Sequence, residues 1–343
     1  MEKEILFGKT LDQLKQVVLE LGLPAFTAKQ LADWLYKKEV TSFEDMTNLS
    51  KNARHLLSEK YEVGLVAPSS VSVSTDGTKK YLYPVKNKQF IEAAYIPDRD
   101  RATLCVSSQV GCRMGCRFCM TARQGFQSNL TAGEIVNQIR SLPERDSLTN
   151  IVYMGMGEPM DNYHHVIQSL EILTADWGFA MSPRRITVST IGIIGTMTKF
   201  LNDSECHLAV SLHSPFDDER RMLMPVQNNH PIEEVLKVIR EYDMSRQRRV
   251  SFEYIMFKDL NDTPRHVNQL ARLLNGIRCR INLIRFHPIP DAPYRSSSDE
   301  TIQQFIDGLN NKGIRTTLRA SRGQDIEAAC GLLSTKALLK QKN

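Results

Sequence analysis

Short strand-like runs alternate with helix-like stretches over most of the chain after residue 102. The runs TLCVS, NIVYMG, RITVST, HLAVSLH, VSFEYIMF and RINLIRFH are short, apolar and rich in β-branched residues. Helical spacing is found at 131–141, 162–176, 231–243, 263–275 and 299–312. Six strands in such a series predict an α/β fold with a parallel sheet under helices, either an open sheet or a full or partial barrel. Functional side chains of such folds lie at the carboxyl ends of the strands.

Two smaller units precede this series. Residues 11–61 place apolar side chains such as Leu14, Val17 and Leu31 at helical spacing. Residues 71–96 form short alternating runs, and Asp76-Gly77 is typical of a hairpin turn. We therefore predict a helical domain at 1–65, a β-rich connector at 66–97, the main α/β unit at 98–333 and a C-terminal tail at 334–343.

The sequence carries no signal for export or membrane insertion. MEKEILFGKT has no basic start followed by an apolar run, and nowhere do eighteen apolar residues follow one another. We expect a cytoplasmic protein without membrane association. Seven cysteines, an odd number, argue against a disulfide framework and favour thiols that bind a metal or take part in chemistry. The net charge of +5 is compatible with a polyanionic partner but does not require one.

Three cysteines within eight residues form the strongest motif. Cys112, Cys116 and Cys119 have the spacing C-x3-C-x2-C. Thiolates select iron–sulfur clusters or zinc. A structural zinc site normally has four ligands in two pairs, and no second pair occurs here, so zinc is the weaker alternative. A cubane cluster held by three cysteines leaves one iron open to a ligand, which indicates catalysis.

Polar groups and glycines follow several of the predicted strands. The segment Gly155-x-Gly157-Glu158 offers bare backbone and a carboxylate that can accept a hydrogen bond from an ammonium group. Other strands end in side chains that can also be capping or core groups when each is considered alone. These are Ser189, Ser211, His213 and His287. Their convergence on one edge of the sheet predicts a ligand pocket.

Several motifs carry a family resemblance. The cysteine spacing, with Phe118 before the last cysteine, resembles the radical S-adenosylmethionine (SAM) superfamily. The stretches RATLCVSSQVGCRMGCRFC, NIVYMGMGEPMDN, RRITVST, AVSLHSP, INLIRFHPIP and SRGQDIEAACG resemble more narrowly the RlmN/Cfr family of rRNA adenine methyltransferases, over about residues 90–333. ELGLPAFTAKQLADWLY in the N-terminal module is similar too. The resemblance implies a partial (β/α)6 TIM-like barrel with an N-terminal helical domain that assists RNA binding.

The resemblance also implies the cofactors. A [4Fe-4S] cluster would be held by the three cysteines of the triplet, and two SAM molecules would be used per turnover. The positions that match SAM contacts of the family are Gly157, Glu158, Ser189, Ser211, Leu212, His213 and His287. Other members often carry asparagine where this chain has His287, which changes the geometry of that contact.

Two further cysteines match the working thiols of the family. Carbon 2 of adenine is electron-poor and cannot displace the methyl group of a sulfonium. The resemblance implies that Cys330 first accepts the methyl group, that a SAM-derived radical activates it for addition to the ring, and that Cys105 releases the product through a transient disulfide with Cys330. Glu92 matches the proposed acceptor of the ring proton, and Cys105 is the alternative acceptor.

The implied substrate is adenine 2503 of 23S rRNA, methylated at carbon 2, with adenine 37 of tRNA as an additional target. Methylation at carbon 8 uses the same residues and stays open, as does a zinc-stabilised RNA-binding protein without catalysis. Basic pairs could neutralise phosphate, at Arg184-Arg185, Arg220-Arg221, Arg246-x-Arg248-Arg249 and Arg319-x-x-Arg322. We also expect an electron donor such as flavodoxin or ferredoxin, and a monomer.

Overall fold

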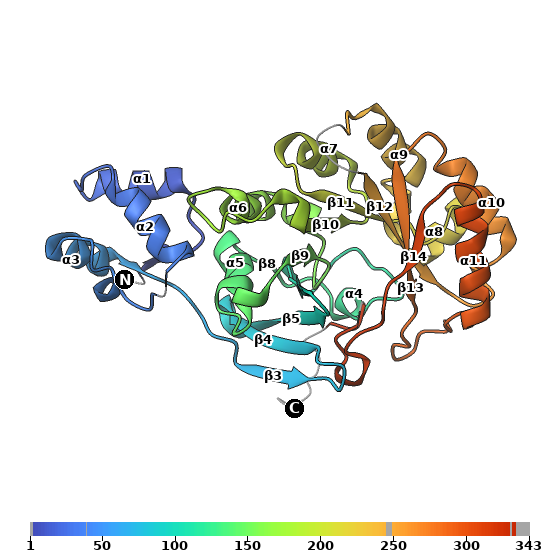
Figure 1. Cartoon of the computed structure of the whole chain (residues 1–343), viewed down its shortest axis with the longest axis horizontal. Coiled ribbons are helices and arrows are strands. Elements are labelled where there is room, and N and C mark those ends of the chain that lie inside the picture. The colour runs from blue at the N-terminus through green and yellow to red at the C-terminus, as the bar shows by residue number, and fades with distance from the viewer. Residues whose placement is uncertain (1–2, 39, 245–248, 330, 334–343) are drawn as a thin grey trace.

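The computed structural model describes residues 3–38, 40–244, 249–329 and 331–333. Its N-terminal unit contains short helices, which the helical spacing predicted, and a two-stranded parallel ribbon, which it did not (Figure 1). Leu14, Leu31, Leu35 and Leu57 are fully buried in its core. The elements are β1 (Glu4–Ile5), α1 (Leu11–Glu20), α2 (Thr27–Tyr36), α3 (Lys51–Lys60) and β2 (Tyr61–Glu62).

This helical unit packs against α5 (Ala132–Arg140) and α6 (Tyr163–Thr174) of the main unit (Figure 1). A Cβ atom on Gly133 would stand 2.5 Å from the carbonyl oxygen of Phe7, so the two backbones meet without an intervening side chain. The side-chain amide of Asn137 pairs with the backbone N–H and carbonyl of Val66 at 3.0 and 2.8 Å. These contacts hold the N-terminal unit in one position on the main unit.

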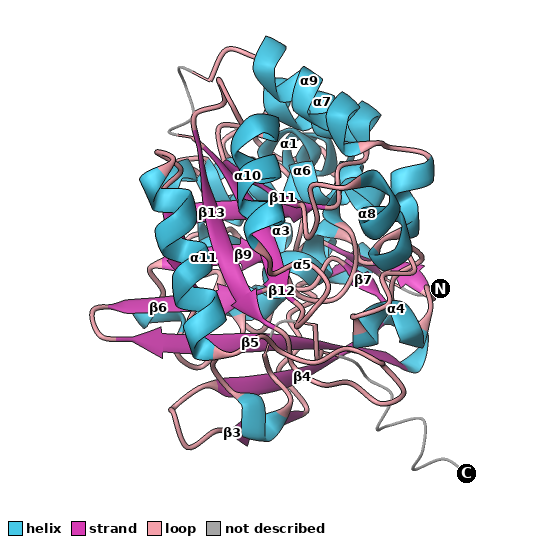
Figure 2. Cartoon of the chain, turned by 90° about the vertical axis from the view of Figure 1, so that its right-hand side faces the viewer, coloured by secondary structure: helices cyan, strands magenta, loops and turns pink. Residues whose placement is uncertain are grey.

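The β-rich segment forms three antiparallel strands, β3 (Ser70–Val73), β4 (Lys79–Val85) and β5 (Gln89–Asp98). The predicted hairpin joins β3 to β4. The segment is less independent than a connector, because β5 pairs along β6 (Arg101–Cys105) from Ala94 opposite Cys105 to Asp98 opposite Arg101. The three strands therefore extend the main sheet, and β4 and β5 cross the lower part of Figure 2.

The main unit is a partial barrel of parallel strands in sequence order, each hydrogen-bonded to the next. Its six predicted strands are all present, and a short seventh strand that the sequence pattern did not indicate follows them. One edge of the ten-stranded sheet is this last strand and the other is β3. The strands after β6 are β9 (Asn150–Tyr153), β10 (Ile186–Thr190), β11 (His207–Ser211), β12 (Val250–Met256), β13 (Cys279–Arg285) and β14 (Thr316–Leu318).

Helices cover the outer face of the parallel strands (Figures 1 and 2). The five predicted helices correspond to α5, α6, α9 (Ile232–Glu241), α10 (Pro264–Leu273) and α11 (Asp299–Asn311). A further crossover helix, α7 (Ile194–Asp203), lies between β10 and β11. The smaller elements are β7 (Gln109–Val110), α4 (Met120–Gln124), β8 (Ser128–Asn129) and α8 (Asp217–Leu223).

The two faces of the strands differ in chemistry. Leu104, Ile151 and Ile186 face one another across β6, β9 and β10 and are fully buried in the main hydrophobic core. Alternate residues such as Ser189 and Glu253 line a cavity on the opposite face. The strands therefore separate an apolar core beneath the helices from a polar interior. No helix in the described part of the chain is long and apolar enough to span a membrane.

Candidate active site

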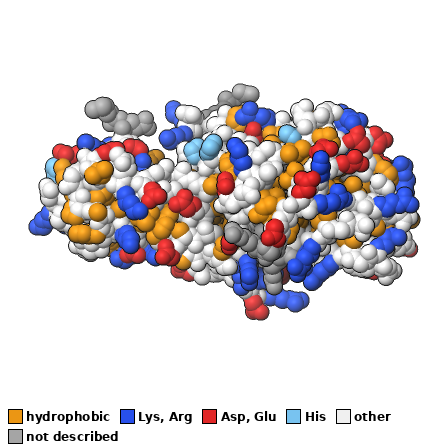
Figure 3. Space-filling view, turned by 90° about the horizontal axis from the view of Figure 1, so that it is seen from above, with side chains coloured by type: hydrophobic (Ala, Val, Ile, Leu, Met, Phe, Trp, Pro, Cys, Tyr) orange, Lys and Arg blue, Asp and Glu red, His pale blue; other side chains and the backbone are white. Residues whose placement is uncertain are grey.

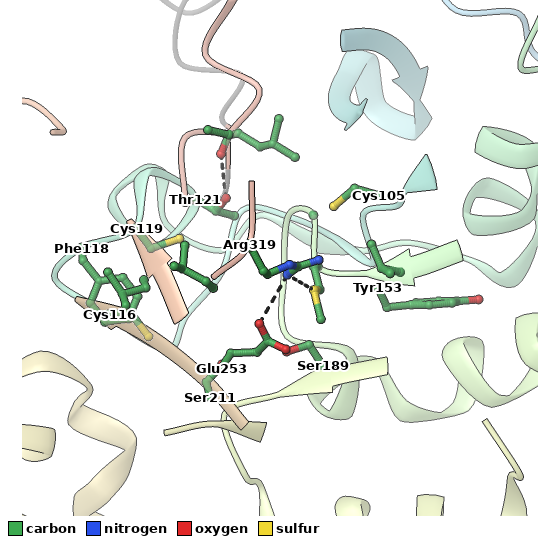
Figure 4. Close-up of a pocket in the computed structure, with 18 of the residues that line it drawn as sticks. Cys105, Cys116, Phe118, Cys119, Thr121, Tyr153, Ser189, Ser211, Glu253 and Arg319 are labelled. Carbon is green, nitrogen blue, oxygen red and sulfur yellow. Dashed lines mark hydrogen bonds and ion pairs between the residues drawn. The ribbon is translucent and has the colours of Figure 1, made fainter. Parts of the chain in front are cut away.

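A cavity of about 500 Å³ lies at the carboxyl ends of the parallel strands (Figure 4). Most of the predicted site residues line it, although they come from different strands and loops. These are Cys105, Cys112, Cys116, Cys119, Gly157, Glu158, Ser189, Ser211, His213 and His287. The structure thus brings together residues that are more than 180 positions apart in the sequence.

The loop that carries the cysteine triplet is closed at its base by β7 and β8, which pair antiparallel. Gly111 has a φ of +72°, and a Cβ atom there would stand 1.7 Å from the carbonyl oxygen of Gly125. Only glycine therefore allows the two ends of the loop to meet. Cys119 is the N-cap of α4, so the third cysteine begins a helix while the first two lie in irregular backbone.

Cys112 and Cys116 are buried, and Cys119 is half-buried. Burial raises the pKa of the Cys112 thiol to about 12 and that of Cys116 well above its ordinary value, and the neighbouring thiols raise both further. In the absence of a metal these thiols are protonated at neutral pH. Because a metal ligand must be a thiolate, metal binding releases protons at this site.

Glu158, which directly follows Gly157, is buried. Its carboxylate accepts hydrogen bonds from the backbone N–H groups of Met160 and Ile191, both at 3.0 Å. Burial raises its pKa to about 7, against the lowering effect of these hydrogen bonds. Gly157 has a φ of +100°, and a Cβ atom there would stand 2.5 Å from the Cβ of Gln109. The segment is thus tightly packed, and Glu158 can accept a hydrogen bond from an ammonium group.

His213 follows β11 with a φ of +57°. Its Nδ1 accepts a hydrogen bond from the backbone N–H of Ile255 at 3.0 Å, and its ring stands edge-on to Phe118 with centroids 4.8 Å apart. Burial, and then the charge of Arg220, lower its pKa to about 3. The ring is therefore neutral with its proton on Nε2, which can donate to a ligand. His287 is half-buried, and burial lowers its pKa as well.

Two of the predicted residues do not line the cavity. The side chain of Leu212 is fully buried in the main core, and its backbone N–H donates to the carbonyl of Glu253 at 3.0 Å. Glu92 is buried on β5 and forms an ion pair with Lys80 at 3.2 Å. Because Ala94 stands opposite Cys105, the strand alternation puts Glu92 on the same sheet face as that thiol.

Cys330 lies outside the described residues, but its neighbours belong to the site. Ala329 and Gly331 line the cavity. Ala328 packs against Cys105 and Ala94 in a small cluster of buried residues. The C-terminal segment therefore reaches the same wall of the cavity as the Cys105 thiol.

Arg319 and Glu253 both line the cavity, and the sequence did not predict that they form a pair there. Arg319 forms an ion pair with Glu253 at 3.4 Å and contacts the sulfur of Met154 at 3.0 Å (Figure 4). In this view Cys119 lies on one side of the guanidinium and Cys105 on the other. A signal was available, because Glu253 is the one charged residue in the apolar run VSFEYIMF.

The prediction that Arg220 contacts phosphate is wrong, because this side chain is fully buried. Its neighbour Arg221 is exposed, as are Arg184 and Arg185. Arg246 and Arg248 lie outside the described residues. Lys/Arg and Asp/Glu side chains alternate along the face seen in Figure 3, so no single basic patch dominates that face.

The chain is similar to known proteins over its whole length. Residues 106–274 match the model of the radical SAM superfamily, and residues 5–63 match the N-terminal domain of ribosomal RNA large subunit methyltransferases. A probable dual-specificity RNA methyltransferase RlmN of Parabacteroides distasonis is 57% identical and covers 98% of each chain. The dual-specificity RNA methyltransferase RlmN of Syntrophus aciditrophicus is 43% identical over 96% of each chain. The crystal structure of a radical SAM methyltransferase from Sphaerobacter thermophilus matches with a TM-score of 0.90 and 39% identity, covering 96% of this chain and 99% of that one.

The partial barrel and the cysteine-lined cavity at its strand ends define a radical SAM protein. Within that superfamily, the chain belongs to the RlmN family of RNA methyltransferases. Membership decides against the zinc-stabilised binding protein without catalysis. It implies a [4Fe-4S] cluster and SAM as cofactors.

The residues present fit these groups. Three thiols line one cavity, beside a buried carboxylate that can bind an ammonium group. Among the described residues, no three His, Cys, Asp or Glu side chains form a ready-made group for a metal ion. A cubane presents a separate iron to each thiolate, so its ligands need not converge on one point.

Proposed function

We propose that this protein methylates carbon 2 of adenine 2503 in 23S rRNA, and adenine 37 of tRNA as a second substrate. The relatives that are similar over the whole chain are named dual-specificity RNA methyltransferases, which supports two RNA substrates. The observation that carries the chemistry is the position of Cys105, on the wall of the cavity that the cysteine triplet also lines. This thiol lies outside the triplet and is accessible to a reaction inside the cavity.

The cofactors would be held by residues already described. Cys112, Cys116 and Cys119 would bind the cluster, and Glu158 and the backbone around Gly157 would bind the amino group of SAM. When bound, SAM would supply the methyl group and a radical that abstracts hydrogen, and the cluster would donate and accept single electrons. A second SAM is needed per turnover because the first is consumed in methylating Cys330.

In the proposed reaction, the Cys330 thiolate attacks the SAM methyl carbon, the bond from that carbon to the sulfonium sulfur breaks to release S-adenosylhomocysteine, and Cys330 becomes an S-methyl thioether. This methyl group would then lose one hydrogen atom to the SAM-derived radical, which allows the carbon to bond to C2 of adenine. The adduct would then lose one electron to the oxidised cluster and its C2 proton to a base, for which Glu92 is the proposed residue and Cys105 the alternative.

Release requires the second thiol. The Cys105 thiolate attacks the sulfur of Cys330, the carbon–sulfur bond breaks, and the methylene carbon takes up a proton to become the product methyl group. The disulfide that remains has lost two electrons relative to the two thiols. An external thiol must return them before the next turnover.

Other components follow from this proposal. An electron donor such as flavodoxin or ferredoxin would reduce the cluster, and the protein would act as a cytoplasmic monomer. The target adenine must be splayed out of folded RNA to enter the cavity, so RNA shape would govern recognition. Exposed basic residues on the N-terminal unit, such as Lys29 and Lys51, would contact phosphate.

Mass mapping of the modified base tests the proposal. The anaerobically reconstituted holoprotein is incubated with SAM, a reductant and either a 23S rRNA fragment or tRNA. We expect a methyl group on C2 of one adenine in each RNA. A methyl group on C8 alone would replace the proposal with the alternative regiochemistry, and unmodified tRNA would remove the second substrate.

A further inference from the structure

Arg220 is a fully buried cation beside the cysteine site. Its guanidinium donates to the backbone carbonyls of Ile191 at 2.9 Å, Ser211 at 3.2 Å and Leu212 at 3.2 Å, and to the side-chain carbonyl of Gln227. All of these acceptors are neutral. Arg319, which lines the cavity, differs because it is paired with a carboxylate.

A buried charge is costly unless an opposite charge compensates it. No salt bridge joins Arg220 to a carboxylate among the described residues. Asp217 hydrogen-bonds to Gln227 rather than to Arg220 and is paired with Arg221 on the surface, although its charge also acts on Arg220. Among the described residues, Arg220 therefore has no hydrogen-bonded carboxylate, and Asp217 compensates its charge only from a distance.

The loop that carries the cysteine triplet lies close to Arg220 and its helix α8. Cys116 and Arg220 are close enough to interact electrostatically. The backbone N–H of Arg117 donates to the carbonyl of Leu223, which is on the same helix as Arg220. Cys116 and Leu223 also pack in one hydrophobic cluster. Helix α8 therefore presents a fixed positive charge to the loop that carries the thiols.

Arg220 also joins the cluster side of the cavity to the SAM side. Its bond to the carbonyl of Ile191 holds the peptide after β10, and the N–H of Ile191 donates to Glu158 at 3.0 Å. Its bond to the carbonyl of Ser211 holds the end of β11, and the side chain of Ser211 lines the cavity. One guanidinium thus fixes the ends of two neighbouring strands.

We propose that Arg220 is the built-in counter-charge of the iron–sulfur cluster, a positioning residue that stabilises the reduced cluster and fixes the strand ends around it. Reduction adds one negative charge to the cluster, and a buried positive charge nearby favours that state. The inference rests on the cluster that family membership implies. It does not depend on which RNA atom is methylated, so either proposal can fail without the other.

The test compares two variants of Arg220. Arg220→Met keeps the apolar part of the side chain but removes the charge, and Arg220→Lys keeps the charge but removes the planar set of guanidinium N–H donors. Arg221→Met is the matched control, because it removes an exposed arginine from the adjacent position of the same helix. Each holoprotein is reconstituted anaerobically. Iron and sulfide content, circular dichroism and the midpoint potential of the cluster from a spin-resonance titration are measured.

We expect the reduced-to-oxidised ratio of Arg220→Met at a fixed potential to fall tenfold or more, which is about 59 mV for a one-electron couple. Arg220→Lys should recover most of this loss, and Arg221→Met should match the wild type. Loss of iron from a folded Arg220→Met, with iron retained by Arg220→Lys, would also support the counter-charge. A wild-type potential in Arg220→Met would overturn the proposal, as would equal losses in the Met and Lys variants.

Discussion

The backbone N–H of Met120 donates to the carbonyl of Gly331 at 2.8 Å. Met120 follows the last cysteine of the triplet, and Gly331 belongs to the C-terminal segment that reaches Cys105. The cysteine loop and the C-terminal segment are therefore held together by backbone contacts. The methyl carrier that we propose on that segment would need such an anchor, because it would have to meet first SAM and then the target adenine.

Thr121 supplies a second anchor, since its hydroxyl donates to the carbonyl of Leu333 at 2.7 Å within a buried contact. Thr121→Val keeps the shape but leaves that carbonyl unpaired, which costs about 1 kcal/mol or more. We expect hydrogen exchange of 328–333 to accelerate about fivefold while the iron content stays normal. Thr198→Val is the control, because its hydroxyl bonds within α7 far from this segment. Unchanged exchange in Thr121→Val would show that the anchor is unimportant.

Cys105→Ala should trap the enzyme on its RNA. Without the resolving thiol, the carbon–sulfur bond to Cys330 cannot be exchanged for a disulfide, so a covalent protein–RNA adduct should accumulate toward one per enzyme. Denaturing gels and mass spectrometry would detect it. Cys330→Ala should give neither adduct nor product, and Cys279→Ala, which removes a thiol that packs on the main core, should turn over normally. Free methylated RNA from Cys105→Ala would contradict the role that we propose for Cys105.

Glu92 and Lys80 form an ion pair, so one residue can be tested against the other. Glu92→Gln and Lys80→Met both break the pair and should each lower the free energy of unfolding by about 1–3 kcal/mol. If Glu92 accepts the ring proton, only Glu92→Gln should also slow single-turnover product formation, by tenfold or more. Equal rates in the two variants would assign Glu92 to structure and leave the proton to Cys105.

The strand order and the place of the site could be predicted because they depend on local patterns. Runs such as RITVST are short and β-branched, and residues that end parallel strands must meet at one edge. Helix α7 was not predicted, because Gly192 and Gly195 interrupt the helical spacing near its start. Strand β14 has only three residues and is specified by pairing with β13.

Side-chain environments were harder to predict, because they depend on residues distant in the sequence. Arg220 lies in DDERRML, a stretch polar enough to suggest a solvated helix. It can be buried because three backbone carbonyl groups accept its hydrogen bonds, and these carbonyls lie at the ends of β10 and β11. The Glu92–Lys80 pair likewise depends on the register between β4 and β5, in which Glu92 stands opposite Leu82.

Glu158 should make the stability of the metal-free protein depend on pH. Its pKa is about 7 in the folded protein, because burial disfavours the charged form, and 4.5 is the ordinary value that the unfolded chain has. Between these values the folded state keeps a proton that the unfolded state has released, so the free energy of unfolding should fall as pH rises from 4.5 to 7. Glu158→Gln removes this titration. Urea unfolding at a series of pH values should therefore show that the free energy of unfolding of the variant rises relative to that of the wild type between pH 4.5 and 7, by on the order of 2–3 kcal/mol. Parallel curves for the two proteins would mean that the carboxylate is ionised throughout, as it would be if water reached it.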